Sequence, residues 1–286
     1  MTPVTVVPPS AFAGLALRRG LAARPGHPGG FVNVRFLRLA QLAGLLAGPL
    51  LAGARPLTSP LRSEAVRAAL ADEPGAFAAV AAHPATVRSL EATFRDLRRG
   101  PPAVTAALAA RPDPAASVAH LYDTFRARTA SFADEEDVAG AAADAVAGDV
   151  PALAELGHVV VYLPARLSPA EWSLLEALAD RRSLTVVMGR TGDPEVDATV
   201  DGAALERFAQ LLGPPATTPD ATAPGATAIV SAPDPEDEVR AVLRLVMERV
   251  RAGTPLHRIA LLYRQSDPYA RLAREQIGRA SCRERV

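Results

Sequence analysis

Arginine is the residue type in this sequence whose chemistry is most informative. All 31 basic residues are arginine, and the chain contains no lysine. The absence of lysine excludes chemistry that depends on an amine, such as the lysine of a phosphate-binding loop or of a Schiff base. A guanidinium group, in contrast, forms paired hydrogen bonds to phosphate and carboxylate groups. The arginines are therefore the candidates for contacts with phosphates.

Four arginines flank the first two predicted strands, at the ends where α/β sheets usually bind ligands. In that place they could contact DNA phosphates, with an affinity that falls steeply as salt is added. Residues 1–100 hold 12 arginines against 5 acids, whereas residues 101–200 hold 7 against 15, although the total net charge is zero. Uneven charge is also usual on a plain solvated surface, so ordinary surface arginines are the alternative. The four residues are Arg18, Arg19, Arg35 and Arg38.

Metal binding and nucleophilic catalysis have little support in the sequence. Cys282 is the single cysteine, and no two histidines have the i, i+4 spacing of a helical metal pair. Four successive acids at 134–137 are more suited to starting a helix, where the dipole favours negative charge, than to surrounding one ion. The turn 189–193 could bind an anion, although a single Gly-x-x-Gly is common in plain turns. Trp172 is expected in the core rather than as a platform for base stacking. We predict no cofactor and no metal.

The pattern of elements predicts an α/β fold, in which short apolar strands alternate with capped helices. From about 60 to 156 the pattern is almost wholly helical, which favours a large helical insertion in the sheet domain. The elements expected before it are a strand over Val4–Val7, a helix over Ala11–Ala23, a strand over Phe31–Phe36 and a helix over Leu39–Leu46.

The clearest unit in the sequence follows this helical region. His158–Leu163 is a continuous apolar run, typical of a strand buried on both faces. Ser168 and Glu171 have the spacing of a capping box, with a proline at the first helical position between them. Leu184–Met188 is the next apolar run. Strand, helix and strand together predict a parallel βαβ unit with a right-handed crossover.

A second domain is expected after a linker. Residues 214–226 are rich in proline, alanine and threonine, which is typical of a linker. Beyond it we predict a strand over Thr227–Ser231, a helix that Asp234 caps, and a strand over Ile259–Tyr263. These elements indicate the start of a second α/β domain over 227–276.

The two ends of the chain carry separate predictions. The last ten residues, 277–286, match one reading frame of a common sequencing adapter. We expect them to be an artefact attached to a fragment of a longer polypeptide. The start of the chain lacks the pattern of a signal peptide, and no apolar run reaches the ~18 residues that a membrane span needs. We therefore expect a cytoplasmic protein without a membrane partner.

Several segments together resemble one family. They look like the N-terminal, helicase-like part of bacterial AddB-type proteins, the PD-(D/E)XK nuclease family proteins of double-strand-break repair. The last of them is similar to the opening of the second RecA-like domain in UvrD-type, superfamily-1 helicases. The segments are Val4–Ser10, Val32–Phe36, the βαβ unit at 158–188, and Asp234–Glu238 with its helix and Ile259–Arg264.

The resemblance implies a P-loop helicase-like (RecA-like) parallel sheet over 1–213, with the helical insertion inside it and a second RecA-like domain after the linker. In the helicase family a glutamate near the cap and an arginine after the strand recur, which implies nucleotide-binding roles for Glu238 and Arg264. An ion pair from Arg264 to Glu236 or Glu238 is the structural alternative.

Departures from the family pattern indicate a degenerate motor. An active one needs a Gly-Lys-Ser/Thr loop for the phosphates and an Asp-Glu pair after a buried strand for magnesium. This chain has no lysine, and its best candidate strand, His158–Leu163, ends without an acid. The chain starts close to its first strand, so a phosphate loop lost by truncation before Met1 is an alternative explanation for its absence.

The predicted function is that of a non-catalytic, helicase-like N-terminal fragment of an AddB-type helicase–nuclease subunit in double-strand-break repair. The expected partners are DNA and a helicase subunit that hydrolyses ATP, and the exonuclease activity of the parent protein would lie outside this fragment. The alternative is a scaffold that docks a partner without touching nucleic acid, which the zero net charge favours. A working ATPase is a third, disfavoured reading.

Overall fold

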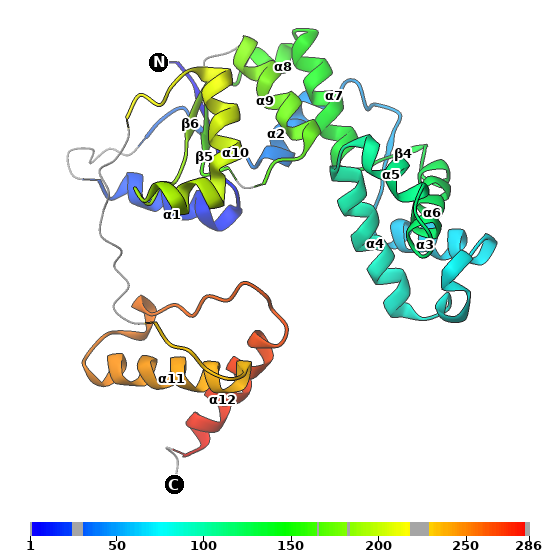
Figure 1. Cartoon of the computed structure of the whole chain (residues 1–286). Helices are drawn as coiled ribbons and strands as arrows, with labels where there is room; N and C mark the ends of the chain where they lie inside the picture. The colour runs from blue at the N-terminus through cyan, green and yellow to red at the C-terminus, as the bar shows by residue number, and fades with distance from the viewer. Residues whose placement is uncertain (1, 25–30, 165, 182–183, 218–228, 284–286) are drawn as a thin grey trace. The chain divides into compact units, whose positions relative to one another are not determined.

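The structure is a computed structural model of the chain (Figure 1), which describes residues 2–24, 31–164, 166–181, 184–217 and 229–283. It divides into two compact units, Met1–Ala221 and Thr222–Val286. The division falls inside the proline-rich segment that the sequence marks as a linker.

The first unit is built on a small parallel sheet in the order β2-β1-β5-β6. Val4 lies opposite both Val34 and His158, so β1 pairs in parallel with β2 on one side and β5 on the other. The mixed α/β class and the βαβ unit are therefore confirmed. The second strand is shorter than expected because Asn33 has a left-handed φ of 63°, outside the β region. The strands are β1 (Val4–Val7), β2 (Val34–Phe36), β5 (His158–Tyr162) and β6 (Leu184–Val187).

Helices cover the two faces of this sheet. Gly14 of α1 lies against Phe36, which is beside Val6 in the sheet, so α1 covers that face. Val7, Val159 and Val161 point to the other face, where they form one core with side chains of α2, α7 and α9. Trp172 belongs to this core and packs on Phe208 of α10 at 4.5 Å between ring centroids, as expected for a core residue. The helices are α1 (Ala11–Ala22), α2 (Leu39–Ala47), α7 (Glu135–Ala147), α8 (Pro151–Ala154), α9 (Pro169–Arg181) and α10 (Pro194–Leu212).

A helical subdomain with its own core is inserted between α2 and α7. Phe94, Leu121 and Phe125 are buried in this second core, which shares no buried residue with the core under the sheet. Its elements are β3 (Arg55–Pro56), α3 (Ser59–Asp72), η1 (Gly75–Val80), α4 (Pro84–Arg99), α5 (Pro102–Ala109), α6 (Ala115–Arg128) and β4 (Phe132–Ala133).

The expected limits of this insertion, about 60–156, need correction at both ends. Val146 of α7 and Leu153 of α8 are fully buried in the core of the sheet, so the last part of the expected insertion belongs to the sheet layers. The insertion also begins earlier than expected, with the short strand β3 at Arg55. This strand pairs in parallel with β4 at Phe132, which lies in the range where only helices were expected. The helical periodicity of α7 could not show which of two cores its apolar face would join.

The second unit consists of helices. Asp234 caps α11 as predicted, since its side chain accepts from the N–H of Asp237. The predicted strand Ile259–Tyr263 is wrong, and residues 229–231 of the predicted strand Thr227–Ser231 form no strand either; residues 227 and 228 lie outside the described ones. A strand needs a hydrogen-bonded neighbour, and no described residue of this unit provides one. The elements are α11 (Pro235–Arg251), η2 (Leu256–Arg258) and α12 (Tyr269–Arg283), which extends into the expected adapter tail.

Candidate functional site

The carboxyl ends of β1 and β5 form the candidate site at the edge of the sheet. From β1 the chain passes through α1 to β2 on one side, and from β5 it passes through α9 to β6 on the other. Because α1 and α9 cover opposite faces, the strand order reverses between β1 and β5. Open α/β sheets bind their ligands outside the carboxyl ends of the strands at such a point.

The connection from β1 to α1 is poor in groups that could hold a phosphate. It consists of Pro8, Pro9 and Ser10, and the two prolines have no N–H to donate. Ser10 is the N-cap of α1, and its Oγ accepts from the N–H of Ala13 at 3.1 Å. A phosphate loop requires several free backbone N–H groups at this position, and three residues of this composition do not supply them.

The end of β5 carries no magnesium ligand. Tyr162, Leu163 and Pro164 follow one another there, and none has a carboxylate. Leu163 has a left-handed φ of 47°, and its N–H donates to the carbonyl oxygen of Val187 at 2.8 Å. The backbone therefore changes direction at Leu163, and this apolar residue stands at the position where a motor would have its metal ligand.

The four predicted phosphate contacts do not form one row. Arg18 stacks over the ring of Phe36, 5.3 Å from its centroid, and Arg19 follows it in the last turn of α1. Arg38 is at the N-cap of α2, where its Nε donates to the side-chain oxygen of Gln41 at 3.4 Å.

Arg35 is separated from Arg18 by the sheet. It is next to Phe36 in β2 and therefore points to the opposite face. There it lies 3.8 Å from the carboxylate of Glu155. A single phosphate backbone lying on the α1 face would thus not reach all four side chains.

Glu238 and Arg264, the predicted nucleotide contacts, line one pocket of about 250 Å³ in the second unit. The hydroxyl of Tyr269 donates to Glu238 Oε2 at 2.7 Å, and this hydrogen bond raises the pKa of Tyr269. Glu236 accepts from Arg240 instead, so the alternative ion pair from Arg264 to either glutamate is not formed among the described residues. The pocket combines one carboxylate, one guanidinium and two phenol rings, which include Tyr263.

The turn 189–193 binds an anion that belongs to the chain itself. The N–H of Thr191 donates to Asp197 Oδ1 at 2.8 Å, and the N–H of Gly192 donates to Oδ2 at 3.2 Å. These bonds, with that of Thr191 first, lower the pKa of Asp197. Arg190 adds an ion pair at 3.4 Å. An external phosphate is therefore not expected here, because the buried carboxylate already occupies the donors.

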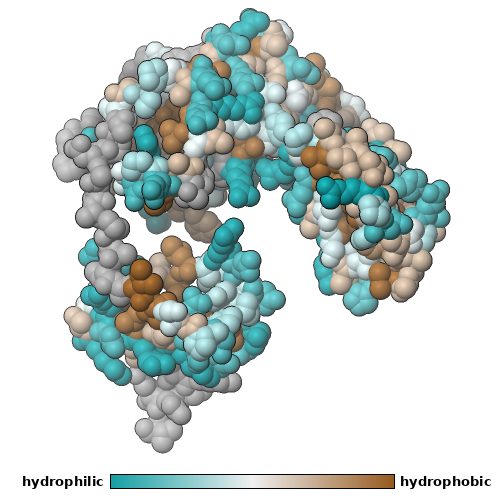
Figure 2. Space-filling view, in the orientation of Figure 1, coloured by the Kyte–Doolittle hydropathy of each residue, from teal (hydrophilic) through white to brown (hydrophobic). Residues whose placement is uncertain are grey.

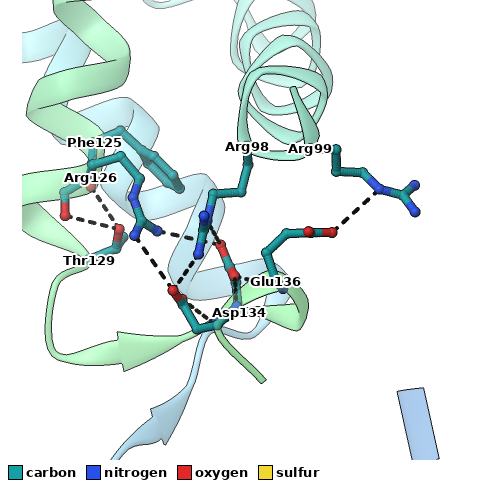
Figure 3. Close-up of polar contacts among 8 residues, drawn as sticks. Arg98, Arg99, Phe125, Arg126, Thr129, Asp134 and Glu136 are labelled. Atoms are coloured by element: carbon teal, nitrogen blue, oxygen red, sulfur yellow. Dashed lines mark hydrogen bonds and ion pairs between the residues drawn. The ribbon is translucent and has the colours of Figure 1, made fainter. Parts of the chain in front are cut away.

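The acids at 134–137 begin α7, as predicted, and also bind arginines that sequence spacing did not connect with them (Figure 3). Asp134 caps the helix and accepts from Arg98 Nε at 2.9 Å, while Arg126 lies 3.4 Å away. Burial opposes ionisation of Asp134, but the N–H of Asp137 and the guanidinium of Arg98 outweigh it and lower the pKa. Among the described residues, no group of histidines, cysteines and acids could hold a metal ion.

Arg99 connects the helical subdomain to two of the helices that cover the sheet. Its guanidinium lies 3.5 Å from Glu136 of α7 and 3.3 Å from Glu171 of α9. Burial raises the pKa of Glu136, and the nearby Glu171 adds to this effect. The sequence provided little indication of this connection. It showed only two arginines at the end of a predicted helix, where basic residues are common.

The comparisons with known proteins give no assignment. No protein-family model matches the chain, and no curated protein matches it. None of the described helices is both long and apolar enough to cross a bilayer.

Proposed function

We propose that this chain is the non-catalytic, helicase-like part of a cytoplasmic AddB-type helicase–nuclease subunit that acts in double-strand-break repair. The observation that carries the proposal is the connection Pro8–Ser10 at the switch point of a parallel sheet. A RecA-like motor would bind its phosphates there, and these residues include two prolines without an N–H and no lysine.

The proposed DNA contacts are Arg18, Arg19 and Arg38, with Arg35 as the weaker candidate because Glu155 already pairs with it. The test is fluorescence anisotropy with a labelled single strand and a labelled duplex at increasing salt. For a single strand, the logarithm of the affinity falls with that of the salt concentration by about 0.7 per phosphate contact. Replacing the first three arginines by alanine should weaken binding and lower this slope by about 2.

Arg111→Ala, at an exposed arginine of the helical subdomain, is the control in this titration and should leave the slope within about 0.5 of the original value. A chain without salt-sensitive affinity for either nucleic acid would contradict the DNA-binding part of the proposal.

A scaffold that docks a partner without nucleic-acid contact is the second candidate. The placement of Arg18 and Arg35 on opposite faces of the sheet favours it, since scattered arginines do not follow a phosphate backbone. The same titration separates the two, because a pure scaffold would show only the weak background binding of a protein with zero net charge.

Glu238 and Arg264 are the proposed nucleotide contacts, in binding without turnover. Binding of a fluorescent ATP analogue with magnesium tests them. Arg264→Ala should weaken binding, whereas Arg258→Ala, an arginine outside the pocket lining, should not. ATP hydrolysis stimulated by DNA would overturn the non-catalytic assignment.

A further inference from the structure

A groove between α3 and α4 has no role in the function proposed above. The two helices lie side by side in the helical subdomain, and the groove between them has a volume of about 510 Å³. The side-chain hydrogen bond between Ser63 and Glu91 joins the two helices along it. Its lining is formed by Ser63, Arg67, Leu70, Ala71, Ala81, Ala82, Pro84, Val87, Arg88 and Glu91.

The lining has helical spacing on both sides. On α3 it follows positions 63, 67, 70 and 71, and on α4 positions 84, 87, 88 and 91, so each helix contributes one face. Leu70 and Val87 are 2% and 5% exposed, which places them at the bottom of the groove. From Ser63 to Ala71 the helix rises about 12 Å, or roughly two turns.

The edges of the groove are positively charged. Arg88 is exposed, and its side chain has no hydrogen bond or ion pair with any residue that the structure describes. Arg67 lies 3.2 Å from Glu64, but both side chains are largely exposed, and such a pair contributes little and is easily exchanged. The acid in the lining, Glu91, is engaged by Ser63. An incoming carboxylate would therefore find two available guanidinium groups.

The apolar surface distinguishes between two anionic partners. Single-stranded nucleic acid needs aromatic side chains on which bases stack, and the lining contains none. Leucine, valine, proline and alanine instead suit the apolar stripe of a helix, whose anchors recur at i, i+3 or i+4, and i+7 over two turns. We propose that the α3–α4 groove docks an amphipathic helix of a partner protein, with acidic residues beside its apolar stripe.

This docking surface is independent of the proposed DNA contacts. None of its residues is among Arg18, Arg19, Arg35 and Arg38, and none lies on the sheet. Loss of DNA binding would therefore leave the groove proposal intact, and the reverse also holds.

The experiment is selection of a phage-displayed library of helical peptides, each about 16 residues long, against the full chain. We expect enrichment of sequences with an apolar i, i+3 or i+4, i+7 pattern and acidic flanks. The dissociation constant of one selected peptide is then measured by anisotropy. Reversing both edge charges, with Arg67→Glu and Arg88→Glu, should weaken it about tenfold or more, since like charges then face each other.

Two further variants separate charge from shape. Ala82→Trp places a large ring in the groove without changing a charge and should also weaken the peptide about tenfold. Arg111→Glu makes the same charge change at an exposed arginine of the helical subdomain outside the groove, and should leave affinity within about twofold. Circular dichroism and the urea midpoint establish that each variant remains folded.

The proposal would be overturned by no enrichment, or by enrichment of basic or non-helical sequences. It would also be overturned if charge reversal left the affinity for the peptides unchanged, or if the reversed variant lost binding to an oligo-dT strand while it still bound the peptides. Dimerisation of the chain itself that charge reversal abolishes would also overturn it, because a second copy would then occupy the groove. Sedimentation velocity at several concentrations measures that last case.

Discussion

At the scale of single residues, most arginines whose side chains form polar contacts in the structure pair with acids of the same chain. Arg98 and Arg126 both reach Asp134, and Arg99 reaches Glu136 and Glu171. These pairs are partly buried, so they connect α4, α6, α7 and α9 more firmly than surface pairs would. A count of arginines therefore overstates the number available to an external phosphate.

Arg98→Ala should destabilise the chain by about 2 kcal/mol, between the costs of exposed and buried pairs. Asp134, with a side chain 9% exposed, would keep only Arg126 as a charged partner. Urea unfolding measures the change. Arg95→Ala, at an exposed arginine of the same helix, is the control and should shift stability by less than about 0.5 kcal/mol. Equal effects of the two variants would contradict the role of the Arg98 pair.

The free energy of unfolding of Glu136→Gln, minus that of the parent chain, should increase as the pH rises from 4 to 8. Burial raises the pKa of Glu136 above its ordinary value of 4.5. Above that value the unfolded chain releases the proton before the folded chain does, so the stability of the parent falls with rising pH. Glutamine removes this dependence and can still accept a hydrogen bond from Ser168.

Urea midpoints at the two pH values measure the effect of Glu136→Gln. Glu135→Gln, at the exposed preceding residue, is the control and should change the midpoints little. If Glu136→Gln lost stability at pH 8 relative to pH 4, the ion pair with Arg99 would outweigh the cost of burial.

At the scale of elements, a helix cap fixes the start of α9, and one glycine allows β5 to pack closely against the chain before β1. Ser168 and Glu171 form the predicted capping box of α9, with Ser168 N–H donating to Glu171 Oε2 at 2.8 Å and Glu171 N–H donating to Ser168 Oγ at 3.2 Å. Gly157 precedes β5 with a left-handed φ of 62° and lies against the carbonyl of Pro3. The capping box is readable in a sequence because its residues are neighbours along the chain, whereas the contact between Gly157 and Pro3 joins distant residues and is not.

Ser168→Ala should cost about 1–2 kcal/mol, because the N–H of Glu171 then loses its acceptor in a buried position. The matched control is Ser10→Ala at the exposed cap of α1, with an expected cost of about 0.5–1 kcal/mol. Thermal unfolding of both variants provides the comparison. A larger loss at Ser10 would show that the α9 cap is not coupled to the core.

Gly157→Ala should destabilise the chain by about 3 kcal/mol or more. An added Cβ would lie 1.9 Å from the carbonyl oxygen of Pro3, where β1 and β5 come together, and the backbone conformation also disfavours alanine. Gly140→Ala is the control. Gly140 is inside α7 with no atom near an added Cβ, so alanine there should add about 0.5–1 kcal/mol of stability. Urea unfolding measures both variants, and the same glycine-to-alanine change should lower the free energy of unfolding at 157 and raise it at 140.

At the scale of the whole molecule, the two units differ greatly in how much apolar surface they bury. The described part of the second unit has a core of Val239, Leu272 and Ala273. Figure 2 shows hydrophobic surface on this unit, and Ile229 and Leu262 are 98% and 90% exposed. Each cluster of the first unit is larger.

Hydrogen exchange of the intact chain should therefore proceed faster in α11 and α12 than in β1 and β5. Amides are protected in proportion to the free energy of the opening that exposes them, and a small core opens at low cost. Mass spectrometry of peptides from both units measures the rates. Equal protection in α11 and β5 would mean that the second unit is stabilised by more than its own core.

The extent to which the sequence predicted this molecule depended on the range of the interactions involved. The run His158–Leu163 and the helix start at Asp234 were recognisable, because a few adjacent residues carry the signal. Ile259–Tyr263 has the same apolar character, but it remains unpaired in the described part of its unit, with Leu262 exposed. The run predicts the capacity to form a strand, whereas a strand also requires a partner.

The sequence by itself determined the parallel α/β class, the positions of the caps and the absence of a lysine for phosphate binding. These follow from composition and from residues within one helical turn of each other. Only the tertiary structure decided that Arg18 and Arg35 face opposite sides of the sheet, that Asp197 fills the turn 189–193, and that α3 and α4 enclose a groove. Those features join residues far apart in the chain, and the free energy that selects them comes from burying surfaces and pairing charges after the elements have formed.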